Sequence, residues 1–437
     1  MKIRSLNNAS TLIETEDVTI LIDPWLVGDL YKGAWSPYAK ITDLSFLKAV
    51  SVVFISHIHE DHWDSHTLEL IDRSARVLLP KMKVNSVIES RLKLMGFENI
   101  QFLNFGKKYE VSNSVDVLVI PPLNSFGQEI GSYHGGYESD ATCIDTGLLL
   151  SDKATSSSHL FLCDNTPYDL KLLSENIDCK LTTLWYPFNS YAQDYPICYG
   201  LTEAEKICIH NDMHTKRIEV TKACVMELKP SYYLPHSADF VLNGAMRLAF
   251  SEYTREEFMD RERVASTYDF SDDAACNSVP TCAVAGDEIT VISSSKIDIH
   301  RNKYPWEKVI SSDNLEPLTS EVTDELWGNA LLAFGAMNER LKRFGVDISD
   351  AIEWVLILQT EAKKIAFSFR DAQVIEYDAI TAEDKKLSVT LTEQQLASLL
   401  SKELHWNNAM IGCHLVFHRT PNQYCQSIYK ALNFLHL

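Results

Sequence analysis

Short hydrophobic runs bounded by turn residues dominate the first 240 positions, and this pattern predicts β-strands with helices between them. The first two runs, at 9–15 and 18–22, are separated by Glu16-Asp17 and predict a hairpin. Strands are also predicted at 52–55, 76–79, 115–120, 140–150, 159–163, 181–185 and 232–234, and helices at 65–73, 85–95, 170–175 and 202–228. Strands that come together early and then mix with helices indicate helices layered on sheets.

The composition changes near 269–288, where Asp, Asn, Pro and Gly residues gather. From about residue 304 the pattern restarts with a long predicted helix at 318–344. Strands follow at 354–359, 365–369 and 373–377, and then a helix at 392–400 that opens with the capping pair Thr392 and Gln395. We therefore predict a first domain at 1–268, a connecting segment at 269–303 and an α+β domain at 304–437.

Charge and cysteine content narrow the class of protein. The chain has 437 residues with 40 Lys and Arg against 60 Asp and Glu, a formal net charge of −20. Such acidity is unfavourable for binding long nucleic acid. No apolar run is long enough for a membrane span, and the N-terminus lacks the apolar core of a signal peptide. Ten cysteines without a Cys-x-x-Cys pair indicate reduced thiols, and we expect a cytoplasmic protein.

The chemistry is concentrated in one motif. His57, His59, Asp61 and His62 directly follow the hydrophobic run 52–55. Imidazole and carboxylate together suit Zn, Fe or Mn rather than Ca. In an extended segment positions 57 and 59 project to the same side, while Asp61 and His62 can turn toward a second point. One loop can thus serve two metal ions about 3.5–4 Å apart, as in two-metal hydrolytic sites.

Four side chains cannot fill two coordination spheres, so further ligands are expected from elsewhere. His134 lies in a glycine-flanked loop, Asp164 follows the predicted strand 159–163, and His236 follows the strand 232–234. Each has a plainer interpretation. His134 and His236 would be ordinary histidines, and Asp164 would cap the helix that follows or close an Asx-turn.

These pieces together resemble the metallo-β-lactamase fold superfamily over roughly residues 1–245. The matching segments are Asn8-Ala-Ser-Thr-Leu-Ile13, Ile22-Asp-Pro-Trp-Leu26, the motif at 57–62, His134, Asp164 and His236. The resemblance implies an αββα sandwich. It also implies that one metal is bound by His57, His59 and His134, the other by Asp61, His62 and His236, with Asp164 bridging.

A narrower resemblance is to the branch with CMP-N-acetylneuraminate hydroxylase and L-ascorbate 6-phosphate lactonase-like proteins. It rests on Asp23-Pro-Trp-Leu26, on Pro235-His-Ser-Ala-Asp239 and on a C-terminal stretch, Leu404-His-Trp-Asn-Asn408 with Ile411-Gly412, Arg419-Thr-Pro-Asn422 and Tyr424. The C-terminal stretch is also similar to sterol-carrier-type lipid-binding domains.

The hydroxylase has an N-terminal Rieske iron–sulfur domain, whereas this chain starts at the hairpin. Cys208-Ile-His210 matches half of a Rieske ligand set, which needs two Cys and two His, but Cys224-Val-Met-Glu227 has Glu in place of the second His. We interpret the two segments as parts of one helix rather than as cluster ligands. An oxygenase of this kind would then need an external reductase.

The first functional hypothesis is a hydrolase with two divalent ions, zinc before iron or manganese, in which a metal-bridging hydroxide attacks a small polar, phosphorylated or lactone-type substrate. Asp61 or Asp164 would carry the proton. The second is a diiron, O2-dependent hydroxylase, and the third a metal-binding module without catalysis. No Gly-x-Ser-x-Gly, Gly-x-Gly-x-x-Gly or Walker-type loop supports another class. The C-terminal domain would cap the site, bind part of the substrate or mediate dimerisation, and the sequence leaves these open.

Overall fold

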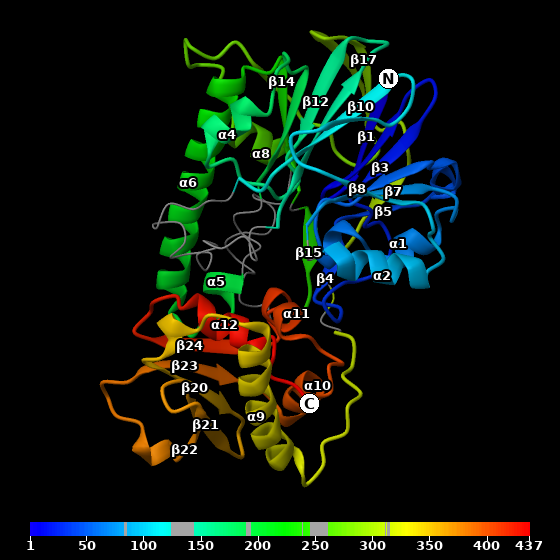
Figure 1. The fold of residues 1–437 in the computed structure, drawn as a ribbon. Helices are drawn as coiled ribbons and strands as arrows, with labels where there is room; N and C mark the ends of the chain where they lie inside the picture. Colours follow the sequence, from blue (N-terminus) through cyan, green and yellow to red (C-terminus); the bar gives the residue numbers. More distant parts are fainter. Residues whose placement is uncertain are drawn as a thin grey trace.

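The fold is that of a computed structural model, which describes residues 1–82, 85–123, 144–188, 194–237, 239–244, 261–310, 312 and 315–437. Within these ranges two large sheets form one body and a smaller sheet forms a second body (Figure 1). No helix in the described part of the chain combines the length and apolar character needed to cross a membrane.

The first sheet begins at the N-terminus. Its strands, in spatial order, are β18 (Lys296–His300), β17 (Glu288–Ser293), β1 (Lys2–Asn7), β2 (Ser10–Glu14), β3 (Thr19–Ile22), β6 (Val52–Phe54), β7 (Arg76–Pro80) and β8 (Ile100–Leu103). The predicted hairpin is β2 and β3, paired antiparallel, and β3, β6, β7 and β8 then run parallel. β1 was not expected from the sequence, and it extends the hairpin to three strands.

The second sheet faces the first. Its strands, in spatial order, are β16 (Val279–Pro280), β14 (Tyr232–His236), β13 (Thr183–Pro187), β12 (Ser157–Phe161), β11 (Gly147–Asp152), β10 (Val115–Ile120) and β9 (Lys108–Glu110). The side chains between the sheets are fully buried and apolar, among them Ile22, Phe54, Phe161 and Trp185. Burial of this shared face is the main force that holds the sheets together.

Helices cover both outer faces, because successive strand residues point to opposite sides and both sides are apolar. Leu21 and Val53 pack on the side of α1 (Ser65–Glu69) and α2 (Ser86–Leu94). Leu160 and Leu184 pack on the side of α4 (Leu170–Glu175), α6 (Glu203–Leu228) and α8 (Arg261–Thr267). The α/β class and the αββα sandwich are therefore confirmed.

The C-terminal body is an α+β unit. Its sheet has the order β22 (Gln373–Ile375), β21 (Lys364–Ser368), β20 (Trp354–Gln359), β23 (Lys385–Thr390) and β24 (Val416–Thr420). Its helices are α9 (Leu326–Phe344), α10 (Glu393–Leu400), α11 (Trp406–Ile411) and α12 (Gln426–Leu432). The capping box at Thr392 and Gln395 is present at the start of α10, as predicted.

The segment predicted as a connection differs from the structure. β17 and β18 lie in the first sheet beside β1, and β16 extends the second sheet. Beyond them, β19 (Trp306–Lys308) pairs with β5 (Ala39–Ile41), and β4 (Trp35–Pro37) pairs with β15 (Phe240–Leu242). Residues 279–280 and 288–300 thus belong to the two large sheets, with β18 at the edge of the first.

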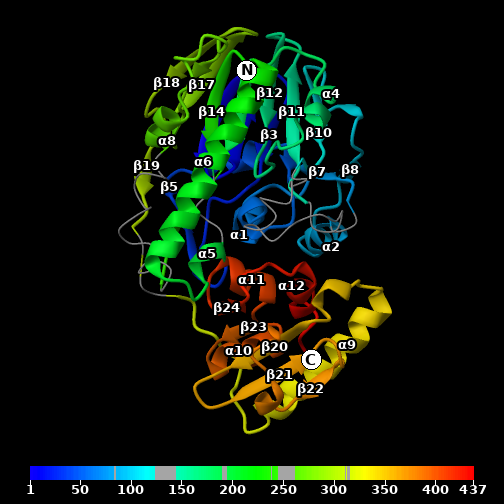
Figure 2. The same cartoon turned by 90° about the vertical axis from the view of Figure 1, so that its left-hand side faces the viewer.

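The two bodies are joined by backbone contacts. α5 (Asp194–Ile197) leads into a short segment that pairs with the edge strand β24, where Gly200 N donates to Phe417 O and Phe417 N donates to Cys198 O, both at 2.8 Å. α6 runs along the sandwich toward this junction, and α11 lies between the bodies (Figures 1 and 2).

Candidate metal centre

The candidate ligands gather where strands end. Asp23 follows β3, Ser56 and His57 follow β6, Asp164 follows β12 and His236 ends β14. The carboxyl ends of parallel strands form one edge of a sheet, and ligand sites in α/β proteins lie at such edges. Asp145 lies just before β11, which is antiparallel to β12, so it reaches the same edge from the opposite direction.

A buried hydrogen-bond chain fixes two of the imidazoles. The carboxylate of Asp23 accepts bonds from Ser56 N, from Ser56 Oγ and from His62 Nδ1, each at 2.7 Å. Ser56 Oγ lies 2.9 Å from His57 Nδ1. Because a carboxylate only accepts, His62 carries its proton on Nδ1. Ser56 Oγ donates its proton to Asp23, so it accepts from His57 Nδ1. In its neutral form each ring then presents an unprotonated Nε2, the form that binds a metal.

Those free nitrogens point into two overlapping donor clusters. One cluster contains His57, His59 and Asp145, and the other His57, His62 and Asp164. His57 Nε2 lies 2.9 Å from His59 Nδ1 and 3.6 Å from Asp145 Oδ1. His62 Nε2 lies 3.2 Å from Asp164 Oδ2. Each cluster therefore combines two imidazoles with one carboxylate.

Asp61 lies beside the second cluster and is held from two sides. Its Oδ2 lies 3.2 Å from His62 Nε2 and accepts a 2.9 Å bond from Asn8 Nδ2. Its Oδ1 accepts a 2.8 Å bond from Tyr31 Oη. Burial and the charge of Asp61 raise the pKa of Tyr31 well above its usual value, so the phenol remains a donor. Asn8 is itself held by buried Arg261, which donates to the Asn8 carbonyl at 2.6 Å.

The charges at this centre favour a bound cation. Burial lowers the pKa of His62, but the carboxylates of Asp61, Asp164 and Asp23 more than offset this and raise it well above the usual value. Burial and the charges of the neighbouring rings lower the pKa of His57. The imidazole that does gain a proton is thus the one surrounded by carboxylates. A bound metal ion would compensate the same negative charge.

The donor set fits a pair of transition-metal ions. Buried His62 Nε2 makes no well-aligned hydrogen bond among the described residues, although oxygens of Asp61 and Asp164 lie 3.2 Å away. Ligation would satisfy it. The nitrogen and oxygen donors present are those that zinc, iron and manganese accept. His57, His59 and Asp145 would hold one ion, and His62, Asp164 and Asp61 the other.

Some of the predicted ligands lie in or beside the two donor clusters, and others do not. The structure brings His57, His59, His62 and Asp164 together in the clusters, with Asp61 adjacent to His62. His236 lies outside both clusters. It is fully buried, with Nε2 3.0 Å from Thr11 Oγ1 and its ring edge-on to Trp185. Its role as a ligand stays a prediction. His134 lies outside the described residues, so its role also stays a prediction.

Sequence reasoning missed Asp145 and the tautomer-setting role of Asp23. The hydrophobic pattern predicts a strand at 140–150 that would include Asp145, but the strand begins at Gly147. A carboxylate two residues before a buried strand was the available signal. Asp23 lies in a segment noted only for its family resemblance, and its backbone has a φ of 45°, which turns the chain sharply after β3.

The structure also places three cysteines that the sequence offered as possible cluster ligands or nucleophiles. Cys208 and Cys224 both lie on α6, as predicted, with Cys208 exposed and Cys224 buried. Burial, together with the nearby carboxylates of Asp23 and Asp164, raises the pKa of the Cys163 thiol well above its usual value, which disfavours a nucleophilic thiolate.

Comparison with known proteins agrees with this geometry. A family model described as a beta-lactamase superfamily domain matches residues 2–129. A putative Rieske 2Fe-2S iron–sulfur protein from Mycolicibacterium smegmatis is 29% identical over 197 residues, which are 43% of this chain and 35% of that protein. The cytidine monophosphate-N-acetylneuraminic acid hydroxylase of Asterias rubens is 27% identical over 125 residues, 28% of this chain and 19% of that protein.

Among solved structures, a metallo hydrolase from the archaeon Ignicoccus hospitalis has a TM-score of 0.40 at 15% identity, covering 69% of this chain and 98% of that one. The chain spans about a third or less of the length of the two curated relatives. The resemblance predicted from the sequence is confirmed: the chain contains a metallo-β-lactamase superfamily domain, is distantly homologous to CMP-N-acetylneuraminate hydroxylase and to Rieske-containing proteins, and is a metal-binding protein of this fold.

Proposed function

We propose that this protein is a non-haem diiron enzyme that hydroxylates a small organic substrate with O2. The observation that carries the proposal is the mixed donor set, in which His57 and His59 with Asp145 would hold one ion and His62 with Asp61 and Asp164 the other. Two histidines with one carboxylate and open positions are typical of non-haem Fe(II) oxygenases. The curated relatives support the same choice, since they are named as an iron–sulfur protein and as a hydroxylase.

Asp145 changes the order of the sequence hypotheses. With His134 as the third ligand, the first metal position would have three imidazoles, a set that suits zinc. With Asp145 it has a harder, anionic oxygen donor, which suits iron or manganese better. Hydrolysis, the reaction the sequence favoured, uses the same residues and is the alternative outcome of the test below.

Two bound iron ions would supply the activation of O2. Residues of this chain would orient the ligands, exclude water and transfer protons. Asp23 holds the Nε2 atom of His62 free and, through Ser56, does the same for His57. Asn8 and Tyr31 hold Asp61, and the buried rings of Phe161 and Trp185 keep water from the strand ends. Asp164, about one-sixth exposed, is our candidate for passing protons to and from the site.

The overall reaction needs an electron donor. One substrate C–H, one O2, two electrons and two protons give one C–OH and one water. We propose that an iron–sulfur or flavin reductase delivers the electrons.

Metal content and oxygen uptake test this function. The protein is expressed in medium with both zinc and iron and analysed for bound metal. It is then loaded with Fe(II), reduced chemically and mixed with O2. Two iron ions per chain, with oxygen uptake that fails in the double variant His57→Ala and His62→Ala, are expected. Two zinc ions per chain and hydrolysis of lactones or phosphoesters would overturn the oxygenase and support the hydrolase. A folded protein without metal would overturn both.

A further inference from the structure

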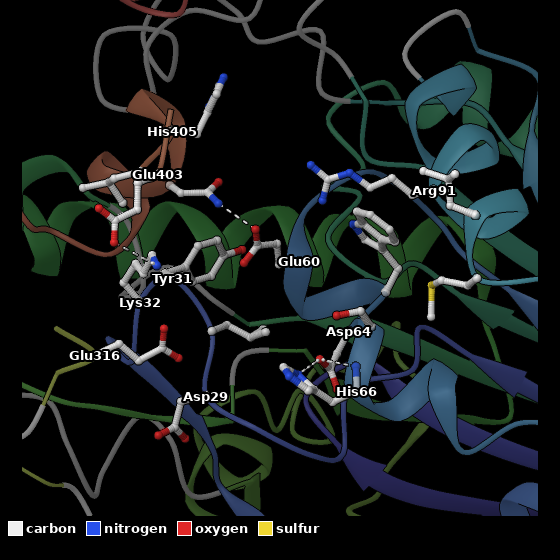
Figure 3. A pocket seen from close by; sticks show the side chains of 17 residues that line it. Asp29, Tyr31, Lys32, Glu60, Asp64, His66, Arg91, Glu316, Glu403 and His405 are labelled. Carbon is white, nitrogen blue, oxygen red and sulfur yellow. Dashed lines mark hydrogen bonds and ion pairs between the residues drawn. The ribbon is translucent and has the colours of Figure 1, made fainter. Parts of the chain in front are cut away.

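α11 and the turn after it lie against the metal loop, although they are about 350 residues away in the chain. Asn408 Nδ2, on α11, donates a 2.6 Å hydrogen bond to Glu60 Oε1 (Figure 3). Glu60 stands between the candidate ligands His59 and Asp61. The C-terminal domain therefore touches the loop at its centre.

A second contact reaches the same loop by another route. His414 Nε2 donates a 2.6 Å bond to the backbone carbonyl of Tyr31, and Tyr31 Oη donates to Asp61 Oδ1. Tyr31 has a φ of 52°, a left-handed conformation that is costly for a residue with a Cβ. A strained residue persists where its surroundings hold it, and His414 is one of those supports.

Contacts at both ends fix the position of α11. Its first residue, Trp406, is buried and donates from Nε1 to Leu435 O at 2.8 Å. Gly412 ends the helix, and a Cβ there would lie 2.7 Å from His414 Nε2. Glycine thus lets the His414 ring lie against the helix end and reach Tyr31.

The contacts border a cavity of about 530 Å³ between the two bodies. Glu60 and Trp63 line it from the metal loop, and Glu403, His405 and Asn408 line it from the C-terminal domain (Figure 3). The Asn408–Glu60 hydrogen bond therefore forms part of the cavity wall where the two bodies meet, and it is only part-buried.

We propose that Asn408 and His414 are positioning residues through which the C-terminal domain holds the metal loop in its ligand-binding arrangement. Asn408 acts through Glu60 on its neighbours His59 and Asp61. His414 acts through Tyr31 on Asp61. The metal part of this inference rests on the proposed function, whereas the ordering of the loop does not.

A donor–acceptor exchange tests the Asn408 contact. Asn408→Asp places a carboxylate against Glu60, and Glu60→Gln removes the acceptor charge. The double variant restores one bond with the direction reversed, from the new amide at position 60 to the new carboxylate at position 408. Asn407→Asp is the matched control, with the same added charge on the next residue of α11. Co²⁺ affinity is measured from its visible absorption, and hydrogen exchange of a peptide spanning 56–63 is measured on metal-free protein.

We expect Asn408→Asp to weaken Co²⁺ binding about tenfold, as changes to groups that support ligands do, and to speed exchange of the loop. The double variant should recover most of both losses, and Asn407→Asp should match the parent. Equal affinity and exchange in Asn408→Asp, or no recovery in the double variant, would overturn the proposal. If the parent binds no Co²⁺, the proposed function fails while loop exchange still decides the positioning role. Should Asn408→Asp not fold, His414→Leu tests the second route by the same readouts.

Discussion

Asp23→Asn is the sharpest perturbation of the candidate metal centre, because it changes one atom type and almost no volume. Asp23 is fully buried and accepts three hydrogen bonds of 2.7 Å, from Ser56 N, Ser56 Oγ and His62 Nδ1. An asparagine has one accepting oxygen, so its NH2 group must face one side. If this NH2 group faced Ser56 N, two donors would meet, because a backbone N–H cannot act as an acceptor. It therefore takes the place of Oδ2, where it faces both His62 Nδ1 and Ser56 Oγ, whose protons can move.

His62 in the variant then accepts at Nδ1 and carries its proton on Nε2. To bind a metal the ring must return the proton to Nδ1, where it would face the new amide at position 23. At least one of the two hydrogen bonds made by Oδ2 in the parent is lost, and one such loss between buried donors costs about 1–3 kcal/mol. That energy corresponds to about 5- to 150-fold weaker metal binding.

Competition between the protein and a coloured chelator for Zn²⁺ measures this loss, and urea unfolding of the metal-free form measures stability. Asp64→Asn is the matched control. Asp64 is also buried, follows the same loop and caps α1 through bonds to His66 N and Thr67 N, but none of its described bonds reaches a candidate ligand. Parent-like Zn²⁺ affinity in Asp23→Asn, or an equal loss in Asp64→Asn, would refute the tautomer argument.

Three further predictions follow from other parts of the molecule. Asp145→Ala should remove one of two bound metal ions in elemental analysis, and His134→Ala should remove none; the opposite pattern would restore the histidine as ligand. Burial lowers the pKa of His159 to about 3, so its contribution to stability is complete above pH 6.5 and falls by about 1.4 kcal/mol per unit below it. Urea midpoints of His159→Gln should thus fall less between pH 7 and 5 than those of the parent, and an identical decline would contradict this. Gly412→Ala should displace the His414 ring and weaken Co²⁺ binding with little change in the C-terminal domain's near-ultraviolet circular dichroism, whereas unchanged affinity would show that the ring adapts.

Local patterns predicted most of the secondary structure because each relevant cue lies within a few residues. The hairpin, β6 and its metal motif, and the capping box at Thr392 all depend on such cues. The strands β17 and β18 were not predicted, although both alternate apolar and polar residues as strands do, because the polar stretch before them was extended as a connection to residue 303. β17 pairs with β18 on one side and, on the other, with β1, which lies nearly 300 residues earlier.

The candidate site was predictable only where the ligands are adjacent in sequence. His57 to His62 form a recognisable spacing, but Asp145 has no such neighbours and enters the site because β11 runs antiparallel to β12. Asn408 and His414 lie still further away, and nothing near them indicates metal chemistry. Their contacts with Glu60 and Tyr31 arise where the C-terminal body meets the sandwich.

That arrangement has a consequence for how the site works. A ligand loop on one domain, held by residues of another, depends on both domains being folded and docked. Glu60 and Asn408 both line the shared cavity, so a molecule bound between them can strengthen or break their bond. A ligand that binds the docked arrangement more tightly would raise metal affinity, and bound metal would raise the affinity for that ligand by the same factor, because such coupling is reciprocal.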